Sequence, residues 1–173
     1  MSLSLYAATI PSFQQILGSV ATLLDKAEEF CAEQRIDAAD IIQARLIDDM
    51  LPFAYQVKST VEHSVGAIAG VRAGNFSPAM DPPPSDFATL KAKVAGGRAA
   101  LDAMTPDEIN ALAGQDMQFS MNDFRIPFTA EGFLLSFSLP NFYFHATTAY
   151  DILRGRGVKI GKMNFLGTMQ VRG

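Results

Sequence analysis

A long connector without helical periodicity, Gly74–Pro84, is the feature that most constrains the fold of this chain. Links between neighbouring antiparallel helices usually take about 2–8 residues, whereas this connector can reach roughly 35 Å at ~3.3 Å per residue. Because a helix of about 20 residues is about 30 Å long, the connector can cross the full height of a helical bundle. The helices on either side of it can therefore run parallel, which a short hairpin link would not permit.

Four long segments carry apolar residues at helical spacing, which predicts four long helices. We expect them over about Leu3–Glu33, Pro52–Val71, Ser85–Met104 and Ala130–Arg154. Pro52 suits the first turn of the second helix, and Ser85 suits the N-cap of the third. Pro11 either kinks the first helix or marks its start, and Pro140 predicts a bend in the fourth.

Two shorter helices are predicted between the long ones. Asp37 is a suitable N-cap for a helix over Ala38–Gln43. The start Thr105-Pro106-Asp107-Glu108 has the pattern of a capping box and predicts a helix to about Leu112. The closing tail carries Phe165 and Leu166, two apolar residues that are suited to docking back on the helices.

Residues 116–129 switch to an alternation of apolar and polar side chains, which predicts a β-hairpin. A two-residue turn at Asn122-Asp123 brings apolar residues opposite one another in the pairs Met121/Phe124, Phe119/Ile126 and Met117/Phe128. Pro127 has no N–H to donate, so it must lie at an unpaired edge position. Because an isolated hairpin is marginal in water, we expect its apolar face to lie against the helices.

The composition is that of one globular domain spanning residues 1–173. Apolar residues make up 49% of the chain and charged residues 18%, a balance that supports a sizeable core. The net charge of −4 and the lack of a Lys/Arg run argue against nucleic-acid binding. The most apolar stretch, Gly132–Leu139, is too short and mixed to span a membrane, and the start has no signal-peptide pattern. With a single cysteine, Cys31, we expect a cytoplasmic protein without membrane association.

A narrow polar seam on the fourth helix is the strongest candidate for a binding site. Ser138, Asn141, His145 and Thr148 share one face of a segment crowded with aromatic and leucine side chains. Buried polar groups must be hydrogen-bonded or used. The simplest interpretation is that His145 bonds a neighbour such as Asn141, and the alternative is a role as ligand or acid–base group. We expect the second histidine, His63, at the surface or the rim of the fold.

The closing run Leu139–Arg154, the following Gly157 and Gly161–Gly167, and the opening Leu5-Tyr6 and Pro11–Phe13 resemble the DinB/YfiT-like superfamily. More narrowly, they resemble an uncharacterised bacterial family in it, a domain of unknown function. The resemblance implies a mainly α fold, an up-down-down-up four-helix bundle with the β-hairpin inserted between the third and fourth long helices. It also implies frequent homodimers and, in many members, a metal held by one histidine of the second helix and an H-x-x-x-H pair of the fourth. Some members are thiol-dependent transferases or isomerases.

This sequence departs from the ligand pattern of that superfamily. The fourth-helix pair reads Asn141-x-x-x-His145, and an amide oxygen is a poor zinc ligand. Gln56 and Lys58 lie near the turn of the second helix where the resemblance places the other histidine. Since the chain has two histidines, the most that a metal could find is His63, His145 and a carboxylate such as Glu62, which points about 100° away from His63 on the same helix. We therefore expect no complete metal site and no cofactor.

Two functional hypotheses follow. The first is a homodimeric DinB-like bundle that binds a small apolar ligand where relatives hold the metal. The candidate residues for it are Ser138, Asn141, His145, Thr148 and Gln56. The second is a metal- or thiol-dependent transferase with an altered ligand set around His145 and His63, which would hold Zn²⁺ or Ni²⁺. The sequence identifies no catalytic residue and leaves open whether the chain is an enzyme.

Overall fold

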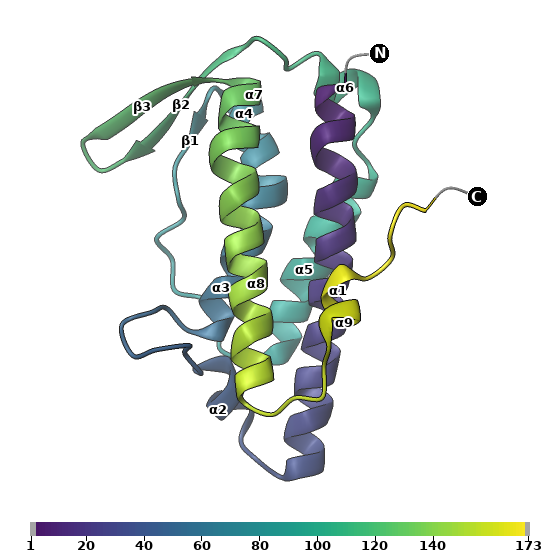
Figure 1. Ribbon diagram of the computed structural model, residues 1–173. Coiled ribbons are helices and arrows are strands. Elements are labelled where there is room, and N and C mark those ends of the chain that lie inside the picture. Colours follow the sequence, from purple (N-terminus) through teal and green to yellow (C-terminus); the bar gives the residue numbers. More distant parts are fainter. Residues whose placement is uncertain (1–2, 172–173) are drawn as a thin grey trace.

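The computed structural model describes residues 3–171 and shows a mainly helical fold with a small sheet. Four long helical stretches lie side by side, and the sheet projects from one end of them (Figure 1). The first stretch is α1, Leu5–Gln34, whose N-cap Ser4 accepts a hydrogen bond from the Ala7 N–H. Pro11 lies inside α1 and so does not mark its start.

The second long stretch is continuous but not uniform. It consists of α3 (Phe53–Val61), a π-helical segment η1 (Glu62–Gly66) and α4 (Ala67–Ala73). Pro52 is the N-cap and not a residue of the first turn, which corrects the prediction by one position. The π-helical segment was not predicted. One wider turn changes the spacing of the apolar residues too little to be distinguished from the ordinary helical period in the sequence.

The third and fourth long stretches differ from the predictions at their ends. The third, α5, covers Phe87–Asp102 and begins one residue later than expected, because Asp86 and not Ser85 is the N-cap. The Asp86 carboxylate accepts the Thr89 N–H at 2.7 Å, which is the bond of an N-cap side chain to the third residue of its helix. The fourth comprises α7 (Ala130–Gly132), a second π-helical segment η2 (Phe133–Ser138) and α8 (Leu139–Gly155). Pro140 follows η2 directly, in the first turn of α8.

The short helices were largely predictable from their caps. Helix α2, Ala38–Ile42, begins behind Asp37, as predicted. Helix α6, Pro106–Asn110, begins with the capping box of Thr105 and Glu108, as predicted, and is shorter than expected. Helix α9, Lys162–Leu166, packs against α1, and Phe165 makes an edge-to-face contact with Tyr150 of α8.

The sheet contains the predicted hairpin and one further strand. Strands β2 (Asp116–Met121) and β3 (Phe124–Thr129) pair in the predicted register, with Met121 opposite Phe124, Phe119 opposite Ile126 and Met117 opposite Phe128. Pro127 lies on the edge strand β3. The connector supplies the extra strand β1, Asn75–Phe76, which pairs in parallel with β2 and has no period of its own to reveal it.

A buried lysine holds the connector against the second long stretch. Lys58 is fully buried, and its Nζ donates to the Ala79 carbonyl at 2.8 Å and to the Asp81 carbonyl at 2.5 Å. It also forms ion pairs with Glu62 at 3.4 Å and Asp81 at 3.3 Å. Because Lys58 lies in α3 and the connector starts after α4, the connector runs back along the helix it has just left, as its length allows.

The core continues without a break from the helices into the sheet. Phe133 is fully buried and contacts Phe76 of β1, Phe128 of β3 and Phe137. Gly70 of α4 leaves room for Phe76, since a Cβ there would lie 2.9 Å from the Phe76 Cβ. No helix among residues 3–171 combines the length and apolar character needed to cross a membrane.

Candidate functional site: a histidine pair between two long helices

The two histidines of the chain lie side by side, although they come from sequence positions 82 apart. Their rings are nearly parallel, with an interplanar angle of 16° and centroids 5.6 Å apart. His63 lies in η1 and His145 in α8. The prediction of a surface or rim position for His63 is wrong, because the residue is only 8% exposed. We call these two side chains the histidine pair.

Gln56 fixes the orientation of His145. The Gln56 Oε1 and the His145 Nδ1 are 2.7 Å apart, and the Gln56 Nε2 donates to the Leu51 carbonyl at 2.8 Å. Since an amide oxygen can only accept, His145 must carry its proton on Nδ1. The lone pair of His145 therefore lies on Nε2. The simpler prediction, that His145 is hydrogen-bonded to a neighbour, is therefore confirmed. The partner is Gln56 and not the Asn141 that was suggested as an example.

Aromatic side chains surround the histidine pair. His63 packs against Phe76 and Phe137, with ring centroids at 5.4 and 5.8 Å. His145 makes edge contacts with Tyr55 at 6.0 Å and Phe144 at 5.3 Å. The pKa of both histidines is lowered from 6.5 to about 4, mainly by burial, to which the neighbouring His145 adds in the case of His63. At neutral pH both rings are therefore uncharged, with lone pairs available to a donor.

The other members of the predicted seam lie on the same helical stretch but do not touch the imidazoles through hydrogen bonds. Ser138 is buried, and its hydroxyl donates to the His63 carbonyl at 2.8 Å, which joins η2 to η1. Asn141 donates its amide to the Phe137 carbonyl at 2.7 Å, and Thr148 donates to the Phe144 carbonyl at 2.7 Å. Ser138 is thus a cross-link between the two π-helical segments, while Asn141 and Thr148 bond their own helix.

One nitrogen of the pair is buried without a hydrogen-bond partner. Among the buried side-chain nitrogen and oxygen atoms of the described residues, only His63 Nδ1 lacks a hydrogen bond. An unpartnered buried polar atom costs about 1–3 kcal/mol, so it is retained where a structural or functional reason exists. No sequence signal indicated this, since it depends on the rotation of His63 within η1.

The described residues do not fit a three-histidine metal centre. Residues 3–171 contain no group of three or more His, Cys, Asp or Glu side chains that could hold a metal ion. The carboxylate named in the sequence prediction, Glu62, is paired with Lys58 and not with the histidines. Burial raises the pKa of Glu62, while Lys58 acts against this rise. Zinc sites in proteins use three or four protein ligands, and the histidine pair supplies two.

Comparisons with known proteins agree with the sequence resemblance. A family model described as a domain of unknown function, DUF1993, matches residues 5–166. The chain is similar to the crystal structure of a DinB family member protein from Shewanella denitrificans, with 27% sequence identity and a TM-score of 0.80. That similarity covers 98% of this chain and 95% of the other. No curated protein matched the chain.

Proposed function

The chain belongs to the family defined by the domain of unknown function DUF1993, and from this premise we propose that it is a cytoplasmic, DinB-type, up-down-down-up helical bundle that binds a small, mainly apolar ligand at the histidine pair. The observation that carries the proposal is the 2.7 Å contact between Gln56 Oε1 and His145 Nδ1. This contact leaves His145 Nε2 as a hydrogen-bond acceptor beside the aromatic rings of Tyr55 and Phe144. A ligand with an apolar body and one O–H or N–H donor matches that surface.

A second candidate, a metal- or thiol-dependent transferase, is favoured by two observations. His63 Nδ1 is buried without a partner, and a histidine that donates its other ring N–H to an oxygen, as His145 does to Gln56, is typical of metal ligands. The two imidazoles would then need further ligands from outside the described residues or from a bound molecule.

The two candidates differ in what stabilises the purified protein. We expect phenol, which has an O–H donor, to raise the Tm more than benzene does, since only phenol can donate to His145 Nε2. Gln56→Met should remove this difference because His145 is then free to move its proton to Nε2. Gln43→Met, a change of an exposed glutamine at the end of α2, is the matched control.

Metal analysis of the same protein tests the second candidate. Stoichiometric Zn or Ni that disappears in His145→Ala would support the transferase and contradict the first proposal. Metal-free protein whose Tm does not respond to ZnCl₂ or NiCl₂ would contradict the second candidate, since binding to the native state must stabilise it. Equal responses to phenol and benzene in the wild-type protein would contradict the first.

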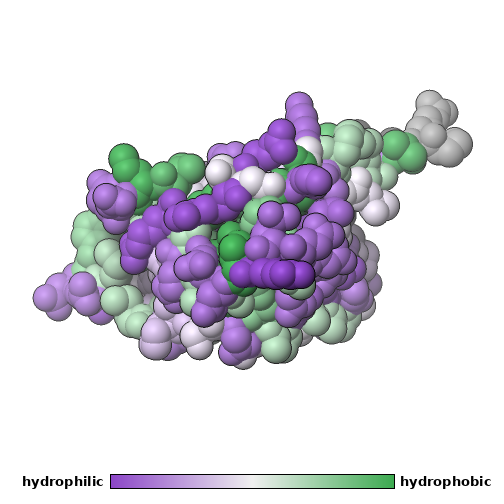
Figure 2. Space-filling model, turned by 90° about the horizontal axis from the view of Figure 1, so that it is seen from below, coloured by the Kyte–Doolittle hydropathy of each residue, from purple (hydrophilic) through white to green (hydrophobic). Residues whose placement is uncertain are grey.

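We also propose that the protein is a homodimer formed along the fourth long stretch. Leu135, Tyr143 and Phe144 are 42%, 37% and 55% exposed on it. Figure 2, which views the molecule from the α2 end, shows a mostly hydrophilic surface with scattered hydrophobic residues, so that end is the poorer interface.

Light scattering should give about twice the 18.7 kDa chain mass, and Phe144→Lys should give the monomer. A monomeric wild-type protein at micromolar concentration would contradict this proposal.

A further inference from the structure

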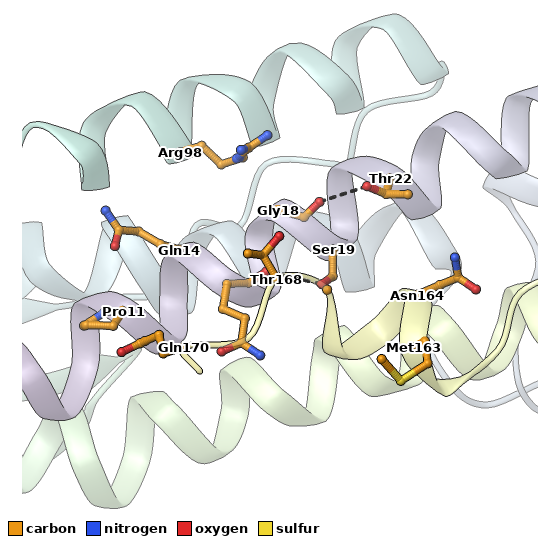
Figure 3. Close-up of a pocket in the computed structure, with 12 residues that line it drawn as sticks. Pro11, Gln14, Gly18, Ser19, Thr22, Arg98, Met163, Asn164, Thr168 and Gln170 are labelled. Atoms are coloured by element: carbon orange, nitrogen blue, oxygen red, sulfur yellow. Dashed lines mark hydrogen bonds between the residues drawn. The ribbon is translucent and has the colours of Figure 1, made fainter. Parts of the chain in front are cut away.

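A polar groove lies between α1, α5 and the segment that contains α9, and neither histidine lines it. Its cavity volume is about 660 Å³, within the range of small-molecule sites. Gln14, Gly18, Ser19 and Thr22 of α1 form its floor, Arg98 of α5 one wall, and residues of α9 and the following segment the other (Figure 3).

The wall that follows α9 is held in place by specific contacts. Gln15 Nε2 donates to the Leu166 carbonyl at 2.7 Å. Gly167 has a φ of +60°, and a Cβ at this position would lie 2.3 Å from Ser19 Oγ, so only glycine can lie this close to α1. The groove is therefore a built feature of the fold and depends on a docked closing segment.

Arg98 is the one charged residue among the described residues that line the groove, and no Asp or Glu lines it. Within residues 3–171 Arg98 makes no ion pair, although the chain carries a net charge of −4. A Cβ at Gly18 would lie 3.9 Å from an Arg98 terminal nitrogen, so the guanidinium lies over a position without a side chain. Guanidinium groups bind carboxylates and phosphates through paired hydrogen bonds.

The neutral lining residues are prepared to bind hydroxyl groups. Thr22 Oγ1 donates to the Gly18 carbonyl at 3.3 Å and Ser19 Oγ to the Gln15 carbonyl at 3.2 Å, which leaves the oxygen lone pairs as acceptors. Asn164 Oδ1 accepts the Gly161 N–H at 2.8 Å, so its amide N–H groups stay available as donors. Asp102 of α5 accepts a hydrogen bond from Gln14 at 2.9 Å. Its carboxylate does not line the groove.

We propose that this groove is a second binding site, for a small hydroxyl-rich anion whose carboxylate or phosphate binds Arg98 and whose hydroxyl groups donate to Ser19 and Thr22. The site is independent of the histidine pair, since its lining residues come from α1, α5 and the α9 segment.

Thermal unfolding at constant ionic strength tests the proposal with four probes at ~10 mM: inorganic phosphate, gluconate, glucose 6-phosphate and glucose. We expect gluconate, glucose 6-phosphate or both to raise the Tm by about 2–4 °C, and neutral glucose to have no effect. A response to gluconate alone identifies a carboxylate ligand, and a response to the phosphates alone identifies a phosphorylated one. A response to inorganic phosphate that equals the response to glucose 6-phosphate would overturn the hydroxyl-rich part of the proposal.

Two variants separate binding at Arg98 from a general charge effect. Arg98→Gln and Gly18→Leu should both abolish the Tm shift, the first by removing the cation and the second by filling the groove from a helical position with free space. Arg154→Gln, which removes an exposed arginine of α8, should keep it. The proposal is overturned if no probe shifts the Tm, or if Arg98→Gln responds as the wild-type protein does.

Discussion

Lowering the pH from 7 to 4 is expected to reduce the free energy of unfolding by several kcal/mol, because the histidine pair resists protonation. In the unfolded chain histidine has a pKa of about 6.5, whereas burial lowers the pKa of His63 and His145 to about 4 in the fold. The unfolded state therefore binds more protons between these values, and stability falls as the pH falls. The slope is about 1.4 kcal/mol per pH unit for each histidine within that window.

Urea unfolding at half-unit steps from pH 7.5 to 4 measures this slope. His63→Phe places an apolar ring beside Phe76 and Phe137 and removes one of the two titrating groups. Between pH 6.5 and 4.5 the variant should lose about half of the wild-type slope. A variant with the same slope as the wild-type protein would show that His63 titrates as a solvent-exposed histidine does.

Replacing Lys58 with methionine is expected to cost about 3–5 kcal/mol, the range for removing one partner of a buried charge pair. Methionine preserves most of the buried stem but leaves the Ala79 and Asp81 carbonyls without their donor. Glu62 also loses its partner in a half-buried position. Urea unfolding of Lys58→Met against Lys159→Met, an exposed lysine, measures the difference.

The cost of Lys58→Met should also depend on pH. Burial raises the pKa of Glu62 in the fold, and Lys58 is the main group that opposes this rise. Without Lys58 the folded pKa rises further, so the ionised carboxylate destabilises the variant more at pH 7 than near pH 4, where it takes up a proton. A pH-independent cost of less than ~1 kcal/mol would show that the connector does not depend on this lysine.

Most of the fold could be predicted from local patterns because local interactions determine those parts. The capping box at Thr105, the N-cap at Asp37 and the hairpin register around Asn122-Asp123 all appear as predicted. Strand β1 could not be predicted, since two residues carry no period and their pairing with β2 depends on residues far along the chain. The change of N-cap from Ser85 to Asp86 shows the usual one-residue uncertainty of helix ends.

The candidate site was only partly accessible from the sequence. The fourth-helix seam and Gln56 could be named from helical spacing and from the resemblance, and the structure brings Gln56 to His145. The prediction for His63 is wrong because its burial depends on Phe76 and Phe137, which belong to other elements and pack against it only in the folded chain. The groove around Arg98 was missed altogether, since its walls meet only after the segment beyond α8 has docked on α1.

The π-helical segment η1 lets the second long stretch pack against two different sets of neighbours. A regular α-helix advances about 100° per residue, so a wider turn shifts the phase of the apolar stripe after it. Helix α3, before η1, packs on α8 and α5, whereas α4, after it, packs on β1 and η2. The change in the direction of the apolar stripe thus allows one continuous stretch to pack against helices through α3 and against the sheet through α4. The Ser138 hydroxyl of the fourth long stretch donates to the His63 carbonyl of the second. This hydrogen bond lies within η1, where the direction of the apolar stripe changes.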